Sequence, residues 1–175
     1  MEINAVSHIH HAREKVYLAY RDELPSIAHF VNNVQAVNVL SRKERPGGVS
    51  LHNEWVGKGE IPKVAQGIIR PEMLRWDDYA EWDDARSLVE WTIKIRVFSE
   101  NFKCSGVNRF VEEGPGRTRV NLTGNLELSL KDIPGVPRIL AGTIAPQVEK
   151  FIVALIKPNL EQTNEAVGKY LDSKR

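Results

Sequence analysis

The stretch that decides the fold is "TIAPQVEKFIVALIKPNLEQTNEAVGKYL", residues 143–171. One helical face is marked there by apolar residues that recur at three- and four-residue spacing: Ile144, Val148, Phe151, Ile152 and Leu155. Thr143 is suited to cap the start of such a helix, and Pro146 is tolerated in its first turn. We therefore expect one long C-terminal helix whose apolar stripe must be covered by another part of the chain.

The covering surface is predicted upstream, where the hydrophobic pattern has a period of two. Three strand pairs are expected: residues 34–44 with 49–57, 73–82 with 88–98, and 102–113 with 117–130. Glycine, proline and aspartate fill the turns between the partners. The alternation places Trp55, Trp91 and Leu122 on buried faces of these strands.

The first thirty residues predict a strand over residues 3–9 and then two short helices, the second beginning near Pro25. The simplest fold for this order is α+β. A curved antiparallel sheet of six to seven strands wraps around the C-terminal helix, with the two short helices after the first strand. Residues 1–175 would form a single domain. Because a curved sheet cannot touch a straight helix along its whole length, a ligand cavity of roughly 300–1,000 Å³ is expected between them.

Composition narrows the classes of function. The 175 residues carry a formal net charge of +1, which argues against the basic surface of a nucleic-acid-binding protein. The single cysteine, Cys104, excludes an internal disulfide and suits a reducing compartment. The pattern of a signal peptide and the apolar run of a membrane span are both missing, so we expect a cytoplasmic protein. Transient contact with a membrane surface stays open.

Three stretches carry a resemblance to a known group of proteins. Residues 9–44 run from a strand end through two helices into the next strand, and residues 102–128 form a late hairpin with a glycine in its first strand. The long helix over residues 148–171 completes the pattern. In this order the stretches resemble the START-like superfamily, the Bet v 1, polyketide-cyclase and lipid-transport group also called SRPBCC.

The resemblance implies a helix-grip fold, a START-like ligand-binding domain and an internal hydrophobic cavity. Members bind lipids, sterols, polyketides or plant hormones, and some are aromatase/cyclases. The fold alone does not choose among these functions. We favour a non-enzymatic binder of a lipid, isoprenoid or polyketide-like molecule, with no cofactor and no metal. A polyketide cyclase/dehydrase-type enzyme and a protein-interaction module are the alternatives, the latter docking through an exposed apolar segment at residues 61–69. The ligand and the oligomeric state stay open.

The histidine cluster in "VSHIHHAREKV", residues 6–16, is a separate question. His8, His10 and His11 lie within four positions, and histidine is a common metal ligand and acid–base group. A zinc site needs three or four supported ligands, and Glu14 is the only obvious carboxylate nearby. We favour histidines that are solvated or locally hydrogen bonded, and expect only His8 to have a claim to face the interior.

The cavity prediction names residues from several strands and from the C-terminal helix. The predicted lining comprises His8, Asn53, Trp55, Tyr79, Trp91, Ile93, Asn108, Leu122, Val148, Phe151, Ile152 and Leu155. The predicted mouth comprises Ile61, Val64, Ile68 and the connector over residues 132–142. No residue is assigned a catalytic role. The pair Asp77 and Asp78 is interpreted as structural, because adjacent strand residues point to opposite faces.

Overall fold

The computed structural model describes residues 1–63, 65–67, 69–96, 98–129 and 138–174. The elements follow the predicted order. In chain order they are β1 (Glu2–Ile9), α1 (Arg13–Asp22), α2 (Leu24–Ile27), η1 (Ala28–Phe30), β2 (Val34–Arg45), β3 (Gly48–Gly57), η2 (Pro71–Met73), β4 (Arg75–Asp83), β5 (Leu88–Ile95), η3 (Ser99–Asn101), β6 (Phe102–Glu112), β7 (Thr118–Leu128) and α3 (Arg138–Ser173).

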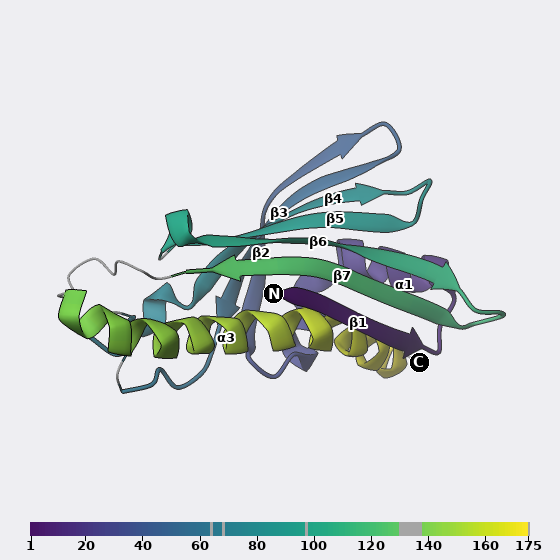
Figure 1. The fold of residues 1–175 in the computed structure, drawn as a ribbon. Helices are drawn as coiled ribbons and strands as arrows, with labels where there is room; N and C mark the ends of the chain where they lie inside the picture. Colours follow the sequence, from purple (N-terminus) through teal and green to yellow (C-terminus); the bar gives the residue numbers. More distant parts are fainter. Residues whose placement is uncertain (64, 68, 97, 130–137, 175) are drawn as a thin grey trace.

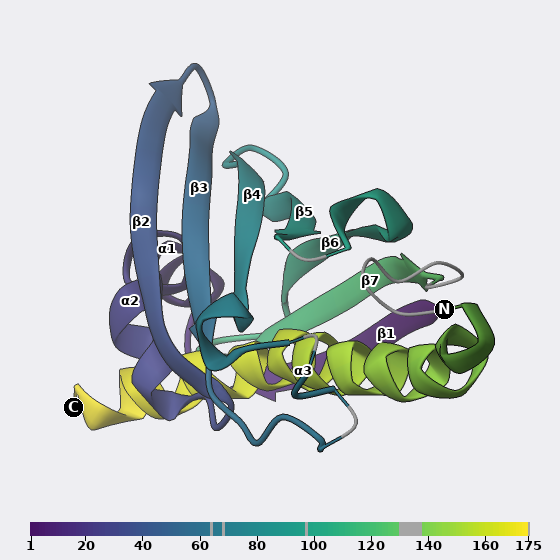
Figure 2. The same cartoon turned by 90° about the vertical axis from the view of Figure 1, so that its left-hand side faces the viewer.

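The strands of the described residues form one seven-stranded antiparallel sheet in the order β1-β7-β6-β5-β4-β3-β2. α3 lies against β1 and β7 and continues past α1 and α2 (Figure 1). The sheet is strongly curved, so the β2–β3 hairpin stands across the direction of α3 while β1 follows it (Figure 2). The predicted helix-grip architecture is confirmed.

Two facing glycines make room for a tryptophan on the concave side of the sheet. Gly106 of β6 pairs with Gly124 of β7. A Cβ atom at Gly106 would lie 2.4 Å from the Trp91 indole, and one at Gly124 would lie 2.8 Å from it. The indole of Trp91 therefore rests directly on the backbone where any side chain would displace it.

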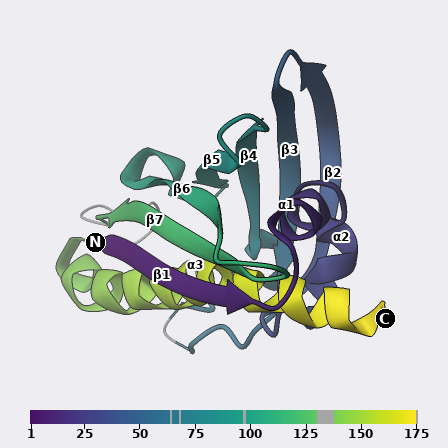
Figure 3. The ribbon, with the colours of Figure 1, turned by 90° about the vertical axis from the view of Figure 1, so that its right-hand side faces the viewer.

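The two short helices close one end of the structure. They lie beside the C-terminal half of α3 (Figure 3). Tyr17 and Tyr20 of α1 pack edge-on or tilted against Trp82 and Phe110, with ring centroids 5.1 to 5.7 Å apart. The Tyr17 hydroxyl also donates a 2.9 Å hydrogen bond to Asp84 in the β4–β5 turn. This aromatic cluster fixes α1 against the sheet and seals that end of the interior.

Candidate ligand cavity

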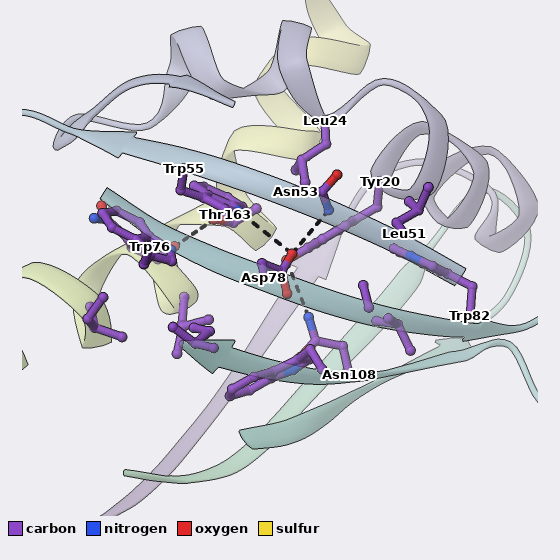
Figure 4. Close-up of a pocket in the computed structure, with 17 residues that line it drawn as sticks. Tyr20, Leu24, Leu51, Asn53, Trp55, Trp76, Asp78, Trp82, Asn108 and Thr163 are labelled. Carbon is purple, nitrogen blue, oxygen red and sulfur yellow. Dashed lines mark hydrogen bonds between the residues drawn. The ribbon is translucent and has the colours of Figure 1, made fainter. Parts of the chain in front are cut away.

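A small cavity lies between the concave face of the sheet, α1 and α3 (Figure 4). Its volume is about 40 Å³. All four tryptophans of the chain line it. The described lining residues are Tyr20, Leu24, Leu51, Asn53, Trp55, Trp76, Asp78, Ala80, Trp82, Val89, Trp91, Ile93, Asn108, Ile156, Asn159, Leu160 and Thr163.

The period-two pattern of the strands and the helical pattern of α3 place these side chains. On β4, every second residue from Trp76 to Trp82 points inward, and Asp78 is the one ionisable member of that row. Ile156, Asn159 and Thr163 follow at three- and four-residue spacing on α3, so they form one stripe over the cavity. Sheet and helix therefore each contribute polar groups to a surface that is otherwise mainly aromatic and aliphatic.

Asp78 is the electrostatic centre of the cavity. It accepts a 3.2 Å hydrogen bond from Nδ2 of Asn53, its partner on β3, and a long 3.5 Å bond from Nε1 of Trp55. Burial raises the pKa of Asp78 to about 6, although these two donors favour the charged form. The seventeen described lining residues include no lysine, arginine or histidine. Among the described residues, the carboxylate is thus hydrogen bonded by neutral groups and faces no cation across the cavity.

Two amide oxygens of residues that line the same cavity lack a hydrogen-bond donor among the described residues. They are Oδ1 of Asn53 and Oδ1 of Asn159, and both are buried. The Asn159 amide is oriented by its nitrogen, which donates a 2.7 Å hydrogen bond to the Leu155 carbonyl. Buried polar atoms are nearly always paired with protein or water. The cavity therefore presents acceptors that a water molecule or a ligand would satisfy.

A second hydrogen-bond chain orients the opposite wall. Nε1 of Trp91 donates a 3.1 Å bond to Oδ1 of Asn108, and Nδ2 of Asn108 donates a 3.3 Å bond to the Tyr20 hydroxyl. Burial raises the pKa of Tyr20 above its usual value, so the phenol stays protonated at neutral pH. These contacts hold the Trp91 indole and the phenol in fixed places.

A second, apolar cavity lies next to the first, toward the N-terminal half of α3. Its volume is about 30 Å³. Phe151, Ile152 and Leu155 line it, and Trp76 and Ile156 line both cavities. Trp76 and Ile156 therefore form the wall between the two spaces. Each of these two interior cavities is far smaller than the expected single cavity of 300–1,000 Å³, because large side chains fill most of the space under the sheet. A more open space of about 990 Å³, lined by Lys103, Leu126 and Lys150 among others, lies beside α3 and shares no described lining residue with them.

The structure divides the predicted lining residues into groups. Five of them lie around the first cavity: Asn53, Trp55, Trp91, Ile93 and Asn108. Phe151, Ile152 and Leu155 lie around the second. Leu122 and Val148 are buried in the core but line neither cavity.

His8 and Tyr79 do not face the interior, and their placement in the cavity was wrong. The His8 side chain is 54% exposed, and its Nδ1 lies 2.7 Å from Glu113. Tyr79 stacks on His52 on the outer face of the sheet, with ring centroids 4.3 Å apart. Side chains alternate between the two faces of a strand, and both residues point to the face opposite the buried one, which carries Ile9 in β1 and Ala80 in β4. Of the other clustered histidines, His11 is buried and its Nε2 lies 2.9 Å from Asp172. The expectation that only His8 could face the interior was therefore wrong.

The predicted mouth is described only in part. Val64, Ile68 and residues 130–137 of the connector lie outside the described residues. Ile61 is half-buried against the core, and Ile69 lines the second cavity. Ala65 and Ile69 are fully or almost fully buried. The expectation that this segment exposes an apolar docking surface was therefore wrong for its described residues.

The sequence interpretation missed Asp78, Tyr20, Asn159 and Thr163. The signal for Asp78 was present, because it has the same strand parity as Trp76 and Ala80, which are both buried. For Asn159 and Thr163 the helical spacing from Ile156 pointed the same way. Tyr20 lies at helical spacing from Val16, which is fully buried, and this was the available signal for an inward position.

Three further features bear on the chemistry. Cys104 is buried, and burial raises the pKa of its thiol to about 12, which leaves it protonated and unreactive. Within the described ranges, no group of three or more His, Cys, Asp or Glu side chains is arranged to hold a metal ion. A search of the same residues found no helix that is both long and apolar enough to span a membrane.

Comparison with known proteins places the fold. No protein-family model matches this sequence, and none of the curated proteins does. Among solved structures, TTHA0849 from Thermus thermophilus is 24% identical over 100% of both chains, with a TM-score of 0.65. The Zhui aromatase/cyclase from Streptomyces sp. R1128 is 15% identical, covers 100% of this chain and 96% of its own, and has a TM-score of 0.62.

A START superfamily protein from Mycobacterium smegmatis is 13% identical over 99% of each chain, with a TM-score of 0.55. These likenesses extend over the whole sheet and the long helix that it encloses. The chain therefore has the helix-grip fold of the START/Bet v 1-like, or SRPBCC, proteins.

Proposed function

We propose that this protein binds a small, largely apolar molecule in its interior, between the curved sheet and α3. The main observation behind the proposal is that the cavity lined by Asp78 is also lined by Asn53 and Asn159, whose buried amide oxygens have no partner among the described residues. Most of the other described lining residues are aromatic or aliphatic. Ligand sites combine apolar walls with a few convergent polar groups in this manner. Burial of the ligand's apolar surface would contribute about 25 cal/mol per Å².

The ligand must enlarge the space that it enters. The first cavity alone, at about 40 Å³, has room for roughly three water molecules, because one water needs about 10–15 Å³ of cavity volume. Displacing Trp76 or Ile156 would join it to the second cavity, and side-chain rotamer changes of this kind are common on binding. The combined site would accept a polar end near Asp78 and an apolar end near Phe151.

The tryptophans supply a direct assay. Since all four line the first cavity, a brominated probe that enters it will quench most of the protein's fluorescence. We expect saturable quenching by 8-bromooctan-1-ol. Binding to Trp76→Ala should be tighter, because this variant joins the two cavities before the probe binds. Val39→Ala, a truncation at an exposed site, serves as the control and should bind like the wild type. Purely linear, unsaturable quenching of both the wild type and Trp76→Ala would overturn the proposal.

A cyclase/dehydrase-type enzyme is the second candidate, and one observation favours it. Asp78 is an ionisable group inside the cavity, and a carboxyl with a pKa of about 6 can give and take protons near neutral pH. The fold is shared with the Zhui aromatase/cyclase. If the protein is such an enzyme, Asp78→Asn will abolish conversion of a linear poly-β-ketone while 8-bromooctan-1-ol still binds. Conversion at the wild-type rate by Asp78→Asn, or none by the wild type, would exclude this role for Asp78.

A further inference from the structure

The described lining of the first cavity carries a negative group and no positive one. Asp78 supplies a carboxylate, and no basic side chain is present among the seventeen described residues that line the space. Asp78 is partly buried, and a carboxylate withdrawn from much of the solvent is costly unless it is paired with a positive charge. Asp78 is held by hydrogen bonds from Asn53 and Trp55, neither of which carries charge. The component that would complete this site is a cation.

The hydrogen-bonding inventory of the described residues points the same way. The unpartnered Oδ1 atoms of Asn53 and Asn159 are acceptors, and Asp78 adds further lone pairs. Trp82 contributes one unpartnered donor, its Nε1. The nitrogen of each amide already donates a hydrogen bond, Asn53 to Asp78 and Asn159 to the Leu155 carbonyl. The oxygen of each amide is therefore the atom left to accept a hydrogen bond from a ligand. A ligand group with several N–H donors would satisfy this set, whereas a carboxylate or carbonyl would add to the excess of acceptors.

The walls beside Asp78 are also suited to positive charge. Trp55 and Trp76 are stacked, with ring centroids 5.8 Å apart and planes at 15°. Tryptophan faces attract ammonium groups through their quadrupoles, most strongly in desolvated sites. The carboxylate therefore lies beside two indoles in a place from which much of the solvent is excluded.

We propose that the ligand is an apolar molecule that carries a protonated amine, and that its ammonium group pairs with Asp78 and donates to the amide oxygens of Asn53 and Asn159. This inference rests on the proposed function and adds the chemical class of the ligand. The apolar remainder of the molecule extends past Trp76 into the second cavity, whose lining is mainly aliphatic and aromatic.

Three probes with the same chain and different head groups test this assignment: octylamine, octan-1-ol and octanoate, each titrated by calorimetry at pH 8. The wild type is expected to bind octylamine at least tenfold more tightly than octan-1-ol, and octanoate the most weakly. Asp78→Asn should lose at least tenfold in octylamine affinity and change its octan-1-ol affinity by less than threefold.

The matched control is Asp77→Asn. Asp77 is the neighbouring residue on β4, but its carboxylate bonds to His52 and Arg96 on the outer face of the sheet. Asp77→Asn therefore removes one negative charge, as Asp78→Asn does, but removes it outside the cavity. It should bind all three probes as the wild type does. Equal binding of octylamine and octan-1-ol by the wild type, or unchanged octylamine affinity in Asp78→Asn, would overturn the inference and leave the proposed function intact. Failure of all three probes to bind would overturn both.

The pH dependence gives an independent readout. Besides Asp78, the titratable groups facing this position are the Tyr20 phenol from α1 and the Cys104 thiol from β6, and burial raises both of their pKa values. His52 acts on Asp78 electrostatically from the neighbouring strand. Octylamine affinity should therefore fall between pH 7.5 and 5 as Asp78 takes up a proton, while octan-1-ol affinity stays level. An octylamine affinity that does not change over this range would contradict the assignment.

Discussion

Asn53 of β3 lies directly opposite Asp78 of β4, and its amide nitrogen donates a 3.2 Å hydrogen bond to the carboxylate. This cross-strand pair places a charged group and its support on the concave face of the sheet. Asn53 is 1% exposed. Burial raises the pKa of Asp78, and the hydrogen bond from Asn53 acts against this rise by favouring the charged form.

Removal of the supporting amide should change the titration of Asp78. In Asn53→Ala the carboxylate loses a donor that favours its charged form, so its pKa should rise above about 6. The titration of the Asp78 side-chain carbon in ¹³C NMR measures this directly. Asn38→Ala removes an equivalent amide that donates to Glu54 on the other face, and should leave the Asp78 titration unchanged. A pKa of Asp78 that falls in Asn53→Ala would show that the amide does not support the charge.

Asp78→Asn is expected to stabilise the protein at neutral pH. The folded-state pKa is raised to about 6 from an unfolded value near 3.9, so the folded state binds the proton more tightly. The favourable contribution of Asp78 is therefore complete below about pH 4 and is lost as the pH rises through 6. Removing the charge should raise the free energy of unfolding by about 1–2 kcal/mol at pH 7.5, and by almost nothing at pH 4.

Thermal unfolding at the two pH values checks this prediction, with a rise in Tm of roughly 3–6 °C expected at pH 7.5. Asp77→Asn should have the opposite sign, because hydrogen bonds from Arg96 and His52 outweigh desolvation and lower the pKa of Asp77. A Tm for Asp78→Asn that falls at pH 7.5 would mean that the charge stabilises the fold.

Gly106 should tolerate no side chain. A Cβ atom there would lie 2.4 Å from both the Thr123 carbonyl oxygen and the Trp91 indole. Because backbone and a packed indole cannot both give way cheaply, Gly106→Ala should cost roughly 3 kcal/mol in urea unfolding. Gly59→Ala is the matched control, since a Cβ atom at Gly59 would meet no described atom within 4 Å. Equal stability of the two variants would show that Trp91 does not depend on this approach.

His8 and His11 both lie beside carboxylates but should differ in their importance for stability. His8 is half-exposed beside Glu113, and solvent screens exposed ion pairs, so His8→Ala should have little effect on stability or probe binding. His11 is 5% exposed and its Nε2 lies 2.9 Å from Asp172, so His11→Ala removes both buried side-chain volume and this contact. His11→Ala should cost about 2 kcal/mol by urea unfolding. A larger loss in His8→Ala than in His11→Ala would reverse this assignment.

Much of the fold was predictable because its elements follow local periodicity. The alternation of apolar and polar residues predicted the strands, and the apolar residues at helical spacing from Ile144 to Leu155 predicted α3. The same rule, applied strictly, would have excluded His8 and Tyr79, which have the opposite parity to Ile9 and Ala80. It would also have included Asp78.

Other features of the site depend on packing that no local pattern encodes. The position of Asn159 over the cavity is set by how α3 lies on the sheet, which is a contact between distant parts of the chain. The small volume results from the way Trp76 and Ile156 fill the space between the two cavities. Side-chain packing of this kind is decided by volume and shape across many residues.

The most direct test of the account is where a bound probe lies. Intermolecular nuclear Overhauser effects between unlabelled octylamine and ¹³C-labelled protein will report which protons lie close to its chain. If octylamine binds in the interior, its chain will contact the Trp76 indole of β4 and the Ile156 methyl groups of α3. Contacts confined to the exposed side chains of Val39 and Leu40 would contradict it, because they would place the molecule on the surface of β2.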